Sequence, residues 1–302
     1  MPAPSSQYVD LMHPEFYKIF DDTLKAGEPY YPNIIRVLDS VNQFEKMSAL
    51  AGIGHLAQID EGAEPAESNP KQKYDKTFTH LTYSIISRLC KNAMDDDRSG
   101  LLKQVPRMQA EAGIKTLETI PAAMFDRSQN ASYTSGDGKV LCATDHPRAD
   151  GGTFSNRPTA NADLGYAVLE AAITDYEGIV DDNGDPAMLV PKMLLINQSN
   201  RFMAAQLLEN MDKVGTANRD LNAVKNQFPG LKAYIYPYLT DTDSWYLIGD
   251  RTEKQIFMFL REKLNKRMYV APDNTLDAIF LSRFRAIAGW LDPKDVYGSI
   301  GG

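Results

Sequence analysis

The chain has 302 residues, of which 43% are apolar and 10% aromatic, so it can form a sizeable hydrophobic core and is not a disordered chain. Its formal net charge of −8 argues against a surface that grips nucleic acid tightly, because such a surface must be basic. Two cysteines, Cys90 and Cys142, are too few for a disulfide framework. We expect neither a signal peptide nor a membrane span, because the N-terminus lacks an apolar segment and no apolar run approaches about 18 residues.

Residues 1–31 are predicted to be a polar arm around one short helix. Pro14 suits the first turn of that helix, where its missing N–H costs nothing, and Gly27 suits the helix end. The apolar residues between them recur at helical spacing and include Phe16 and Phe20. Such a small apolar face cannot bury itself, so the helix must lie on its own body or on a neighbour.

A long β-hairpin is predicted next. Two extended stretches, 34–38 and 77–86, flank a segment rich in Gly, Pro and charge. The descending limb of this hairpin is acidic and the returning limb is basic; the charged residues are Asp60, Glu61, Glu64, Lys71, Lys73 and Lys76. Because an isolated two-stranded hairpin is marginally stable in water, two interpretations stay open: a solvated surface hairpin, or an arm that docks on a partner.

The strongest helix pattern follows residues 95–99, whose acidic and capping side chains suit a helix start. Apolar residues then recur every three to five positions up to Phe125, which predicts a helix on the order of 40 Å long. Pro106 and Pro121 fall within this segment, and each is expected to kink or restart the helix.

Beyond residue 128 the pattern is that of a mixed α+β protein. Residues 128–161 are rich in turn signals around a short strand expected at 139–142. Further helices are predicted at about 161–180 and 199–211, and strands at 188–196 (interrupted by Pro191), 233–239, 245–248, 255–260 and 278–288. Because helices and strands do not alternate regularly, a doubly wound nucleotide-binding fold is disfavoured.

The densest cluster of reactive residue types is Cys142, Asp145 and His146. A nucleophile served by this histidine is one interpretation, but triad partners are assembled by the fold and rarely sit three or four residues apart on one loop. The alternative is a small buried Cys142 beside a turn at His146 and Pro147. The sequence lacks the common nucleotide-binding, metalloprotease and hydrolase motifs, and its four histidines lack metal-ligand spacing. We therefore predict no catalytic residue, no cofactor and no metal.

Several stretches together resemble the major capsid proteins of tailed bacteriophages, whose fold is shared by herpesvirus shells and encapsulins. The stretches that carry the resemblance are ATDHP (143–147), GGTFSN (151–156), DDNG (181–184), LVPKML (189–194), GTAN (215–218) and YLTDTDSWYL (238–247). The match is dense from residue 133 to residue 299, and the order of the earlier elements fits back to residue 14. Pro191 and the segment 251–274 depart from the pattern, so the strand boundaries stay open.

The resemblance implies an α+β fold of the tailed-phage major capsid type, in which an axial domain is inserted into a peripheral domain that contains a long spine helix. The implied ranges are 1–31 for the N-terminal arm, 51–88 for the extended hairpin loop (E-loop), 32–50, 89–127 and 241–289 for the peripheral domain, and 128–240 and 290–302 for the axial domain. Pro106 and Pro121 would then be flex points of the spine helix.

The same resemblance implies the function. The subunit would assemble into pentamers and hexamers and close an icosahedral head around double-stranded DNA, without sequence-specific binding, a membrane or a cofactor. A portal and a scaffold would be its partners, with a decoration protein as an optional one. It would be made in the cytoplasm of the host bacterium and reside in the virion. An encapsulin-type cellular compartment is the alternative, and Lys–Asn crosslinks stay open because no asparagine partner is identified.

Residues expected at contacts between subunits combine apolar groups of the arm with charged groups of the hairpin and of the Gly-rich loop. They are Phe16, Phe20, Asp60, Glu61, Glu64, Lys71, Lys73, Lys76, Arg148 and Arg157.

Overall fold

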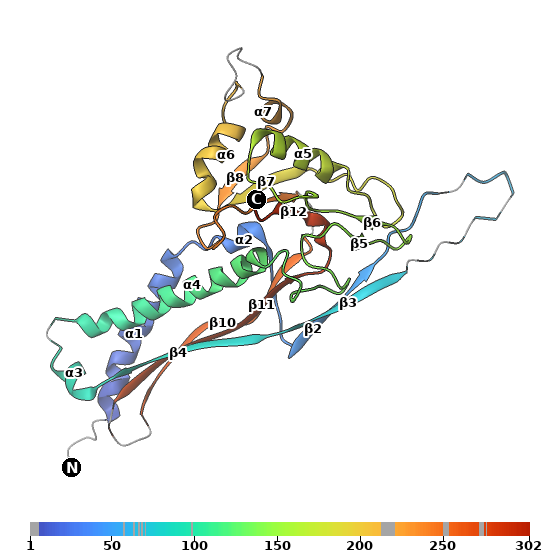
Figure 1. Cartoon of the computed structure of the whole chain (residues 1–302). Helices are drawn as coiled ribbons and strands as arrows, with labels where there is room; N and C mark the ends of the chain where they lie inside the picture. The colour runs from blue at the N-terminus through green and yellow to red at the C-terminus, as the bar shows by residue number, and fades with distance from the viewer. Residues whose placement is uncertain are drawn as a thin grey trace.

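The computed structural model describes residues 6–302 apart from 57, 63, 66, 68, 70, 98, 213–220, 250–253, 272–274 and 276. The GTAN stretch, one of those that carry the resemblance, therefore lies outside the described residues. In the described part, two four-stranded sheets form the body and a hairpin projects from it (Figure 1). Helices and strands follow one another without regular alternation, which confirms the predicted α+β class.

The first sheet has the strand order β1-β10-β11-β4. Its central strands are the longest of the fold: β10 (Ile256–Val270) and β11 (Ala278–Trp290) pair antiparallel. β1 (Arg36–Asp39) runs parallel to β10, and β4 (Leu81–Leu89) runs antiparallel to β11. This strand was predicted to end at residue 260, but it continues to Val270. Register shifts around Glu262 let its charged second part pair with β11.

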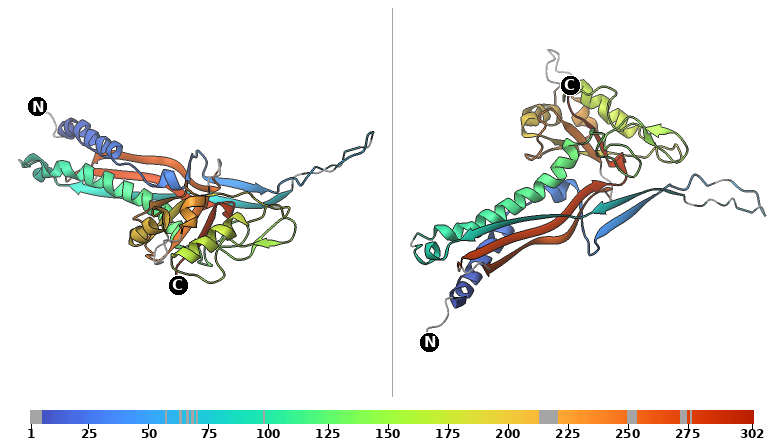
Figure 2. Two further views of the ribbon diagram at one scale, coloured as in Figure 1. Left: turned by 90° about the horizontal axis from the view of Figure 1, so that it is seen from above. Right: turned by 60° about the horizontal axis from the view of Figure 1, so that its bottom comes forward.

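Two long helices, α1 (Ser6–Ala26) and α4 (Gln104–Asp126), lie against one face of this sheet (Figure 2). The rings of Phe16 and Phe20 in α1 lie 6.4 and 6.0 Å from the ring of Phe280 in β11. All three side chains are fully buried. The apolar face of the N-terminal helix therefore finds its partner in its own chain.

The prolines do not break either helix. Pro14 lies inside α1, so the predicted helix start at Pro14 is wrong; packing of the following turns on the sheet stabilises the helix across it. Pro106 falls in the first turn of α4, where its missing N–H has no helical partner to lose, and Pro121 lies within the helix. α4 does not restart at either proline, and it follows the short helices α3 (Lys91–Asp95) and η1 (Leu101–Lys103).

The second sheet has the order β12-β9-β7-β8. β7 (Pro191–Ile196) is parallel to β8 (Lys232–Ile235) and antiparallel to β9 (Trp245–Gly249), which pairs with β12 (Val296–Ser299). Pro191 begins β7 rather than interrupting a strand, as expected of a residue without an N–H. The helices of this half are α5 (Tyr166–Glu177), α6 (Arg201–Leu208), α7 (Ala223–Gln227), η2 (Gln198–Asn200) and η3 (Pro293–Asp295).

β2 (Phe44–Leu50) and β3 (Gln72–Thr79) form a long hairpin, as predicted, but from other strands than the predicted ones. Most of the predicted stretch 34–38 is β1 of the first sheet, and the stretch 77–86 is divided between β3 and β4. The segment 51–71 between them projects from the body on the side opposite to α3 (Figures 1 and 2). A two-residue ladder pairs β5 (His146–Pro147) with β6 (Thr153–Phe154).

Two predicted strands differ locally from the structure. Ile34 ends the short helix α2 (Tyr31–Ile34), so the extended segment begins later than predicted, at Arg36. Residues 139–142 form no strand, and the Cys142 N–H donates instead to the Ser128 carbonyl at 2.8 Å.

Strand pairing moves three of the predicted domain boundaries. β4 belongs to the first sheet, although residues up to 88 were assigned to the E-loop. β9 belongs to the second sheet, although residues from 241 were assigned to the peripheral domain, and Trp290 ends β11 of the first sheet. A strand pattern in the sequence shows that a strand exists and not which strand it pairs with, so these boundaries required the hydrogen-bond register.

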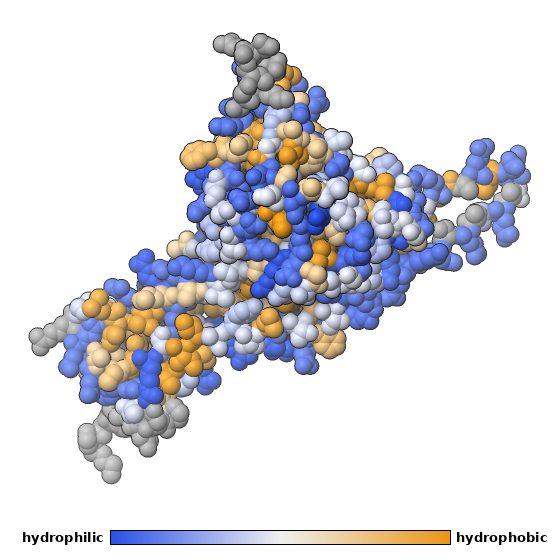
Figure 3. Space-filling view, in the orientation of Figure 1, coloured by the Kyte–Doolittle hydropathy of each residue, from blue (hydrophilic) through white to orange (hydrophobic). Residues whose placement is uncertain are grey.

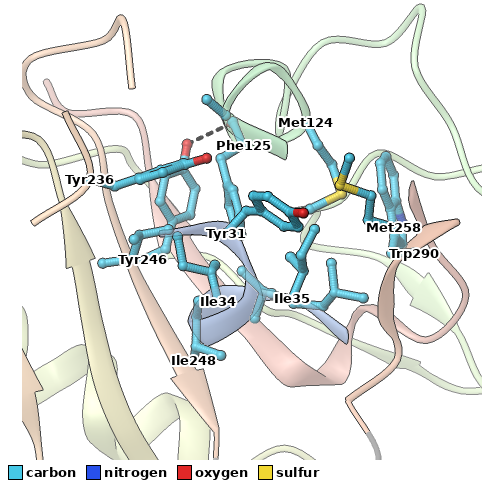
Figure 4. Close-up of a cluster of buried hydrophobic side chains, with 14 of the residues drawn as sticks. Tyr31, Ile34, Ile35, Met124, Phe125, Tyr236, Tyr246, Ile248, Met258 and Trp290 are labelled. Atoms are coloured by element: carbon cyan, nitrogen blue, oxygen red, sulfur yellow. Dashed lines mark hydrogen bonds between the residues drawn. The ribbon is translucent and has the colours of Figure 1, made fainter. Parts of the chain in front are cut away.

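A buried cluster joins the two sheets (Figure 4). It brings Phe125 at the end of α4 against Tyr246 of β9, with ring centroids 5.1 Å apart, and the Tyr246 hydroxyl donates to the Phe125 carbonyl at 2.8 Å. Met258 and Trp290 contribute from the first sheet, and Ile248 from the second. The two halves therefore share one core and form a single packed body.

Glu118 is a charged residue at this junction, and only 1% of it is exposed. Its carboxylate accepts hydrogen bonds from the Tyr30 N–H at 2.6 Å and from the Tyr236 hydroxyl at 2.9 Å. Burial raises the pKa of Glu118, although these hydrogen bonds oppose the shift. One side chain of α4 thus links the start of α2 to the residue that follows β8 of the second sheet.

We predict that Glu118→Ala lowers the free energy of unfolding by about 2 kcal/mol, because it leaves buried donors without an acceptor. Glu118→Gln should retain stability, since its amide can accept from Tyr30 and donate to the Tyr236 oxygen. Because the folded-state pKa of Glu118 is raised, its contribution to stability falls as pH rises through that pKa. In urea unfolding, the free energy of unfolding of Glu118→Gln relative to the wild type should therefore be higher at pH 8 than at pH 5. Equal losses for the two variants at both pH values would contradict this account.

Candidate functional site

The cluster Cys142, Asp145 and His146 does not assemble into a catalytic triad. Cys142 is fully buried, and burial raises the pKa of its thiol to about 12, so it is not a thiolate at neutral pH. Asp145 pairs with Lys139, and hydrogen bonding to that lysine lowers the pKa of Asp145. The aspartate thus faces Lys139 rather than orienting the histidine.

Both ring nitrogens of His146 are already bonded. Nδ1 lies 2.8 Å from Asp137 Oδ2, and Nε2 lies 3.1 Å from Asn156 Oδ1. The imidazole also stacks on the Phe154 ring, with centroids 5.0 Å apart, and is almost completely buried. No ring nitrogen is left to take a proton from Cys142, so His146 fixes the loop rather than acting as a base.

Asn156 is the centre of this loop. Its side-chain oxygen accepts from the Ala143 N–H at 2.8 Å, and its side-chain nitrogen lies 2.7–3.1 Å from the carbonyls of Leu141, Pro293 and Val296. A single buried amide therefore ties the loop to the segment around η3. Asn156 ends the GGTFSN stretch, so the pattern identified the residue, while its role came from the structure.

Steric constraints explain why glycine occupies both positions of the pair in the same stretch. Gly151 has φ of +89°, a left-handed conformation that favours glycine. A Cβ on Gly152 would collide with the Arg148 guanidinium. Arg148 pairs with Asp150 at 2.9 Å. The glycines thus let the loop close around this arginine, which is a structural explanation for the pattern.

No group of three or more His, Cys, Asp or Glu side chains that could hold a metal ion occurs among the described residues. In the same part of the chain, no helix is long and apolar enough to cross a membrane.

The residues expected at subunit contacts fall into two groups. Asp60, Glu61, Glu64 and Lys71 are exposed on the projecting segment, where the expectation stands as a prediction. Phe16 and Phe20 are buried in their own chain, so for them the expectation is corrected: the first sheet provides the apolar partner that the sequence could not show.

The other four candidates are engaged within the chain. Lys73 Nζ lies 2.5 Å from Asp182 Oδ1, and Lys76 Nζ donates to the Thr134 carbonyl at 2.5 Å. Arg157 Nη1 donates to Gln129 Oε1 at 2.8 Å. The lysines anchor the base of the hairpin to the second half of the body, and the arginines hold loops. Their expected role between subunits stays a prediction.

Sequence reasoning missed the partner of Lys73. Asp182 also lies 3.4 Å from Lys294 Nζ, and both side chains are at most 10% exposed. The DDNG stretch served only as part of the resemblance, and nothing in its pattern indicated that Asp182 receives two lysines from distant segments.

We predict that Asn156→Ala lowers the free energy of unfolding by about 3 kcal/mol, because several buried groups lose their partner together. The exposed Asn42, changed to Ala, is the matched control and should shift stability by less than about 0.5 kcal/mol. Urea denaturation followed by fluorescence measures both. A loss no larger than that of the control would rule out the central role of Asn156.

We also predict that the unassembled folded protein shows one reactive thiol. Cys90 is exposed and Cys142 is buried, so a thiol reagent should titrate Cys90 at once and Cys142 only after unfolding. Cys90→Ser should then abolish the native reaction. Rapid reaction of that variant in the folded state would show that Cys142 is accessible.

Comparisons with known proteins place these features in a family. Residues 76–298 match the family model of a phage capsid protein. A search of curated proteins finds no significant match.

Solved structures share the fold at low sequence identity. The procapsid of bacteriophage JBD30 has a TM-score of 0.56 and 13% identity, over 98% of this chain and 75% of that one. A capsid of a native GTA particle has a TM-score of 0.59 and 10% identity, over 90% of both chains. A virus-like particle from Pyrococcus furiosus has a TM-score of 0.53 and 10% identity, over 94% of this chain and 98% of that one.

The family model covers most of the chain, including α4, the strands β4, β10 and β11 of the first sheet, and nearly all of the second sheet. The implied capsid fold is thereby confirmed, with a protruding hairpin, a long helix and two packed halves. The chain belongs to the phage capsid protein family.

Proposed function

We propose that the chain is the major subunit of a phage head, which assembles into pentamers and hexamers and closes an icosahedral shell around double-stranded DNA. The family match over residues 76–298 carries this proposal. In the same proposal the first sheet with α1 and α4 is the peripheral domain, and the second sheet with α5, α6 and α7 is the axial domain.

The projecting segment 51–71 supports assembly. Its apolar side chains Ile53, Leu56 and Ile59 are 58%, 97% and 50% exposed. Figure 3 shows that the rest of this segment is mostly hydrophilic. Exposed apolar side chains on an arm that leaves its own body are typical of a surface that a second molecule covers. The arm interpretation of the hairpin is therefore favoured over a solvated one.

The charge of the chain fits a container for DNA. With a net charge of −8, the subunit repels phosphate on average, so the shell would enclose DNA without gripping it or reading its sequence. Residence in the virion follows from this role, with synthesis in the host cytoplasm.

We infer no catalytic role and no cofactor for this chain. The support is the geometry of the loop, in which Cys142 is buried and protonated while His146 is bonded through both nitrogens. As partners we propose other copies of the chain, a portal and a scaffold, with a decoration protein as an optional addition. The phage capsid match favours this function over the encapsulin alternative.

Electron microscopy of the purified recombinant protein tests the proposed function. Closed particles with five-fold and six-fold clusters are the expected result. Particles absent under all salt and crowding conditions, from protein that is folded by circular dichroism, would contradict it.

We predict that the projecting segment is needed for assembly and not for folding. The Ala51 N–H donates to the Lys71 carbonyl at 2.8 Å, so replacing residues 52–70 with Asn-Gly should close a tight hairpin turn. The shortened protein should keep its melting temperature within a few degrees, because the segment buries little in its own chain. It should form no closed shells by sedimentation and microscopy. Normal shells from this variant would show that the arm is dispensable.

A further inference from the structure

A polar cluster lies where the base of the hairpin joins the first sheet. Its central residue is His80, which stands between β3 and β4 and is 5% exposed. The His80 Nε2 atom lies 2.9 Å from the Oγ of Ser40, the residue that follows β1. Ser40 Oγ also lies 2.6 Å from Oε1 of Glu45 in β2. These three side chains therefore form a chain of hydrogen bonds between neighbouring strands.

The chain of hydrogen bonds fixes the tautomer of His80. A serine hydroxyl has one proton, and the hydrogen bond from Ser40 lowers the pKa of Glu45, so Glu45 is an ionised acceptor at neutral pH. Ser40 donates its proton to Glu45 and must then accept from the N–H at Nε2 of His80. In a neutral imidazole only one nitrogen carries a proton, so Nδ1 of His80 is an acceptor.

The strand register brings Arg285 of β11 to the same face of the sheet as His80. Ser282 donates to Gln109 of α4 at 2.6 Å, so Ser282 faces the helices and Arg285, three residues on, faces away from them. Arg285 pairs with Thr82, which lies two residues beyond His80 and shares its face. Such diagonal neighbours lie about 7–8 Å apart, within reach of a long side chain.

Two buried atoms of this cluster have no hydrogen-bond partner in the part of the chain that the structure describes. One is Nδ1 of His80, the acceptor, and the other is Nε of Arg285, a donor. Buried polar atoms are nearly always hydrogen-bonded in folded proteins, because leaving them unpaired is costly. An unpaired acceptor and an unpaired donor on the same face of the sheet therefore indicate a binding site.

The arginines of this site lack acidic partners. Arg261 lies at the register shift of β10, next to Glu262, and Glu262 is the pairing partner of Arg285. The Glu262 carboxylate pairs instead with Arg283 at 3.2 Å. Among the described residues, no carboxylate pairs with Arg261 or Arg285, and both side chains are only partly exposed. The site therefore combines two uncompensated positive charges.

His80 adds a lone pair to these charges. Burial lowers the pKa of His80, and the charges of Arg285 and Arg261 lower it further, while the charge of Glu45 opposes them. The ring is thus neutral at pH 8. A ligand that satisfies the whole site must offer negative charge to the arginines and a hydrogen-bond donor to His80.

We propose that this site binds a phosphate that retains a P–OH group, with inorganic phosphate as the simplest case. The P–OH donates to His80 Nδ1, and the phosphate oxygens accept from Arg285 Nε and from the Arg261 guanidinium. Sulfate and the phosphodiesters of a nucleic-acid backbone carry no such proton at pH 8, so the site selects against them. The bound phosphate ties β10 and β11 to the base of the hairpin within one subunit.

Isothermal titration calorimetry with inorganic phosphate, at pH 8 and constant ionic strength, tests this site in the purified protein. The wild type should bind one phosphate per chain. Sulfate should bind at least about tenfold more weakly, because its oxygens meet the lone pair of His80 without a proton between them.

Arginine variants separate the site from general charge effects. Arg285→Gln and Arg261→Gln should each weaken phosphate binding at least about tenfold, because each removes a charged donor. Arg267→Gln is the matched control: it removes the same charge from an exposed position farther along β10 and should bind phosphate like the wild type. Circular dichroism checks that each variant is folded, and the two site variants test the site independently of each other.

Three outcomes overturn the proposal. Absence of saturable phosphate binding to the wild type would exclude the site. Equal phosphate affinities of the wild type and both folded site variants would show that the arginines do not hold the ligand. Equal affinities for sulfate and phosphate at pH 8 would show that His80 Nδ1 accepts no P–OH. None of these measurements requires assembly, so they are independent of the proposed shell function.

Discussion

The constraint on which the structure depends is that the segment between β2 and β3 leaves the body, and that every residue described between 52 and 69 is exposed. Leu56 is 97% exposed, and covering one such side chain is worth about 1.5–3 kcal/mol. Exposed apolar side chains on a projecting arm are a liability for a free protein and an advantage for a subunit. The arm therefore explains why a chain with a complete core still has an unsatisfied surface.

The rest of the fold holds this arm in place. β2 and β3 continue the arm into the body, where Lys73 meets Asp182 and Lys76 meets the Thr134 carbonyl. Behind them, the shared core between the sheets keeps α4 and β9 in one unit through Phe125 and Tyr246. Because the base of the arm is fixed by short polar contacts, its direction is set by the body, which is what a regular shell requires.

The sequence allowed some of this to be predicted and left the rest open for physical reasons. Periodic apolar residues predicted α4. Extended stretches around a Gly/Pro-rich segment predicted that a hairpin exists, but the stretch 34–38 belongs to the first sheet and not to the hairpin. The patterns around His146 and Asn156 pointed to the family, but their hydrogen bonds depend on Asp137 and on the segment at η3, which local patterns do not reveal. Strand partners were equally hidden, so β4 was assigned to the E-loop and β9 to the peripheral domain. The burial of Phe16 and Phe20 against Phe280 was missed as well.

Hydrogen exchange of the backbone amides in residues 52–70 tests the central claim most directly, when the free subunit is compared with the assembled shell. The account predicts rapid exchange in the free subunit and strong protection after assembly, while the amides of β9 and β11 are protected in both states. Rapid exchange of this segment in intact shells would contradict the claim that a neighbouring subunit covers the arm.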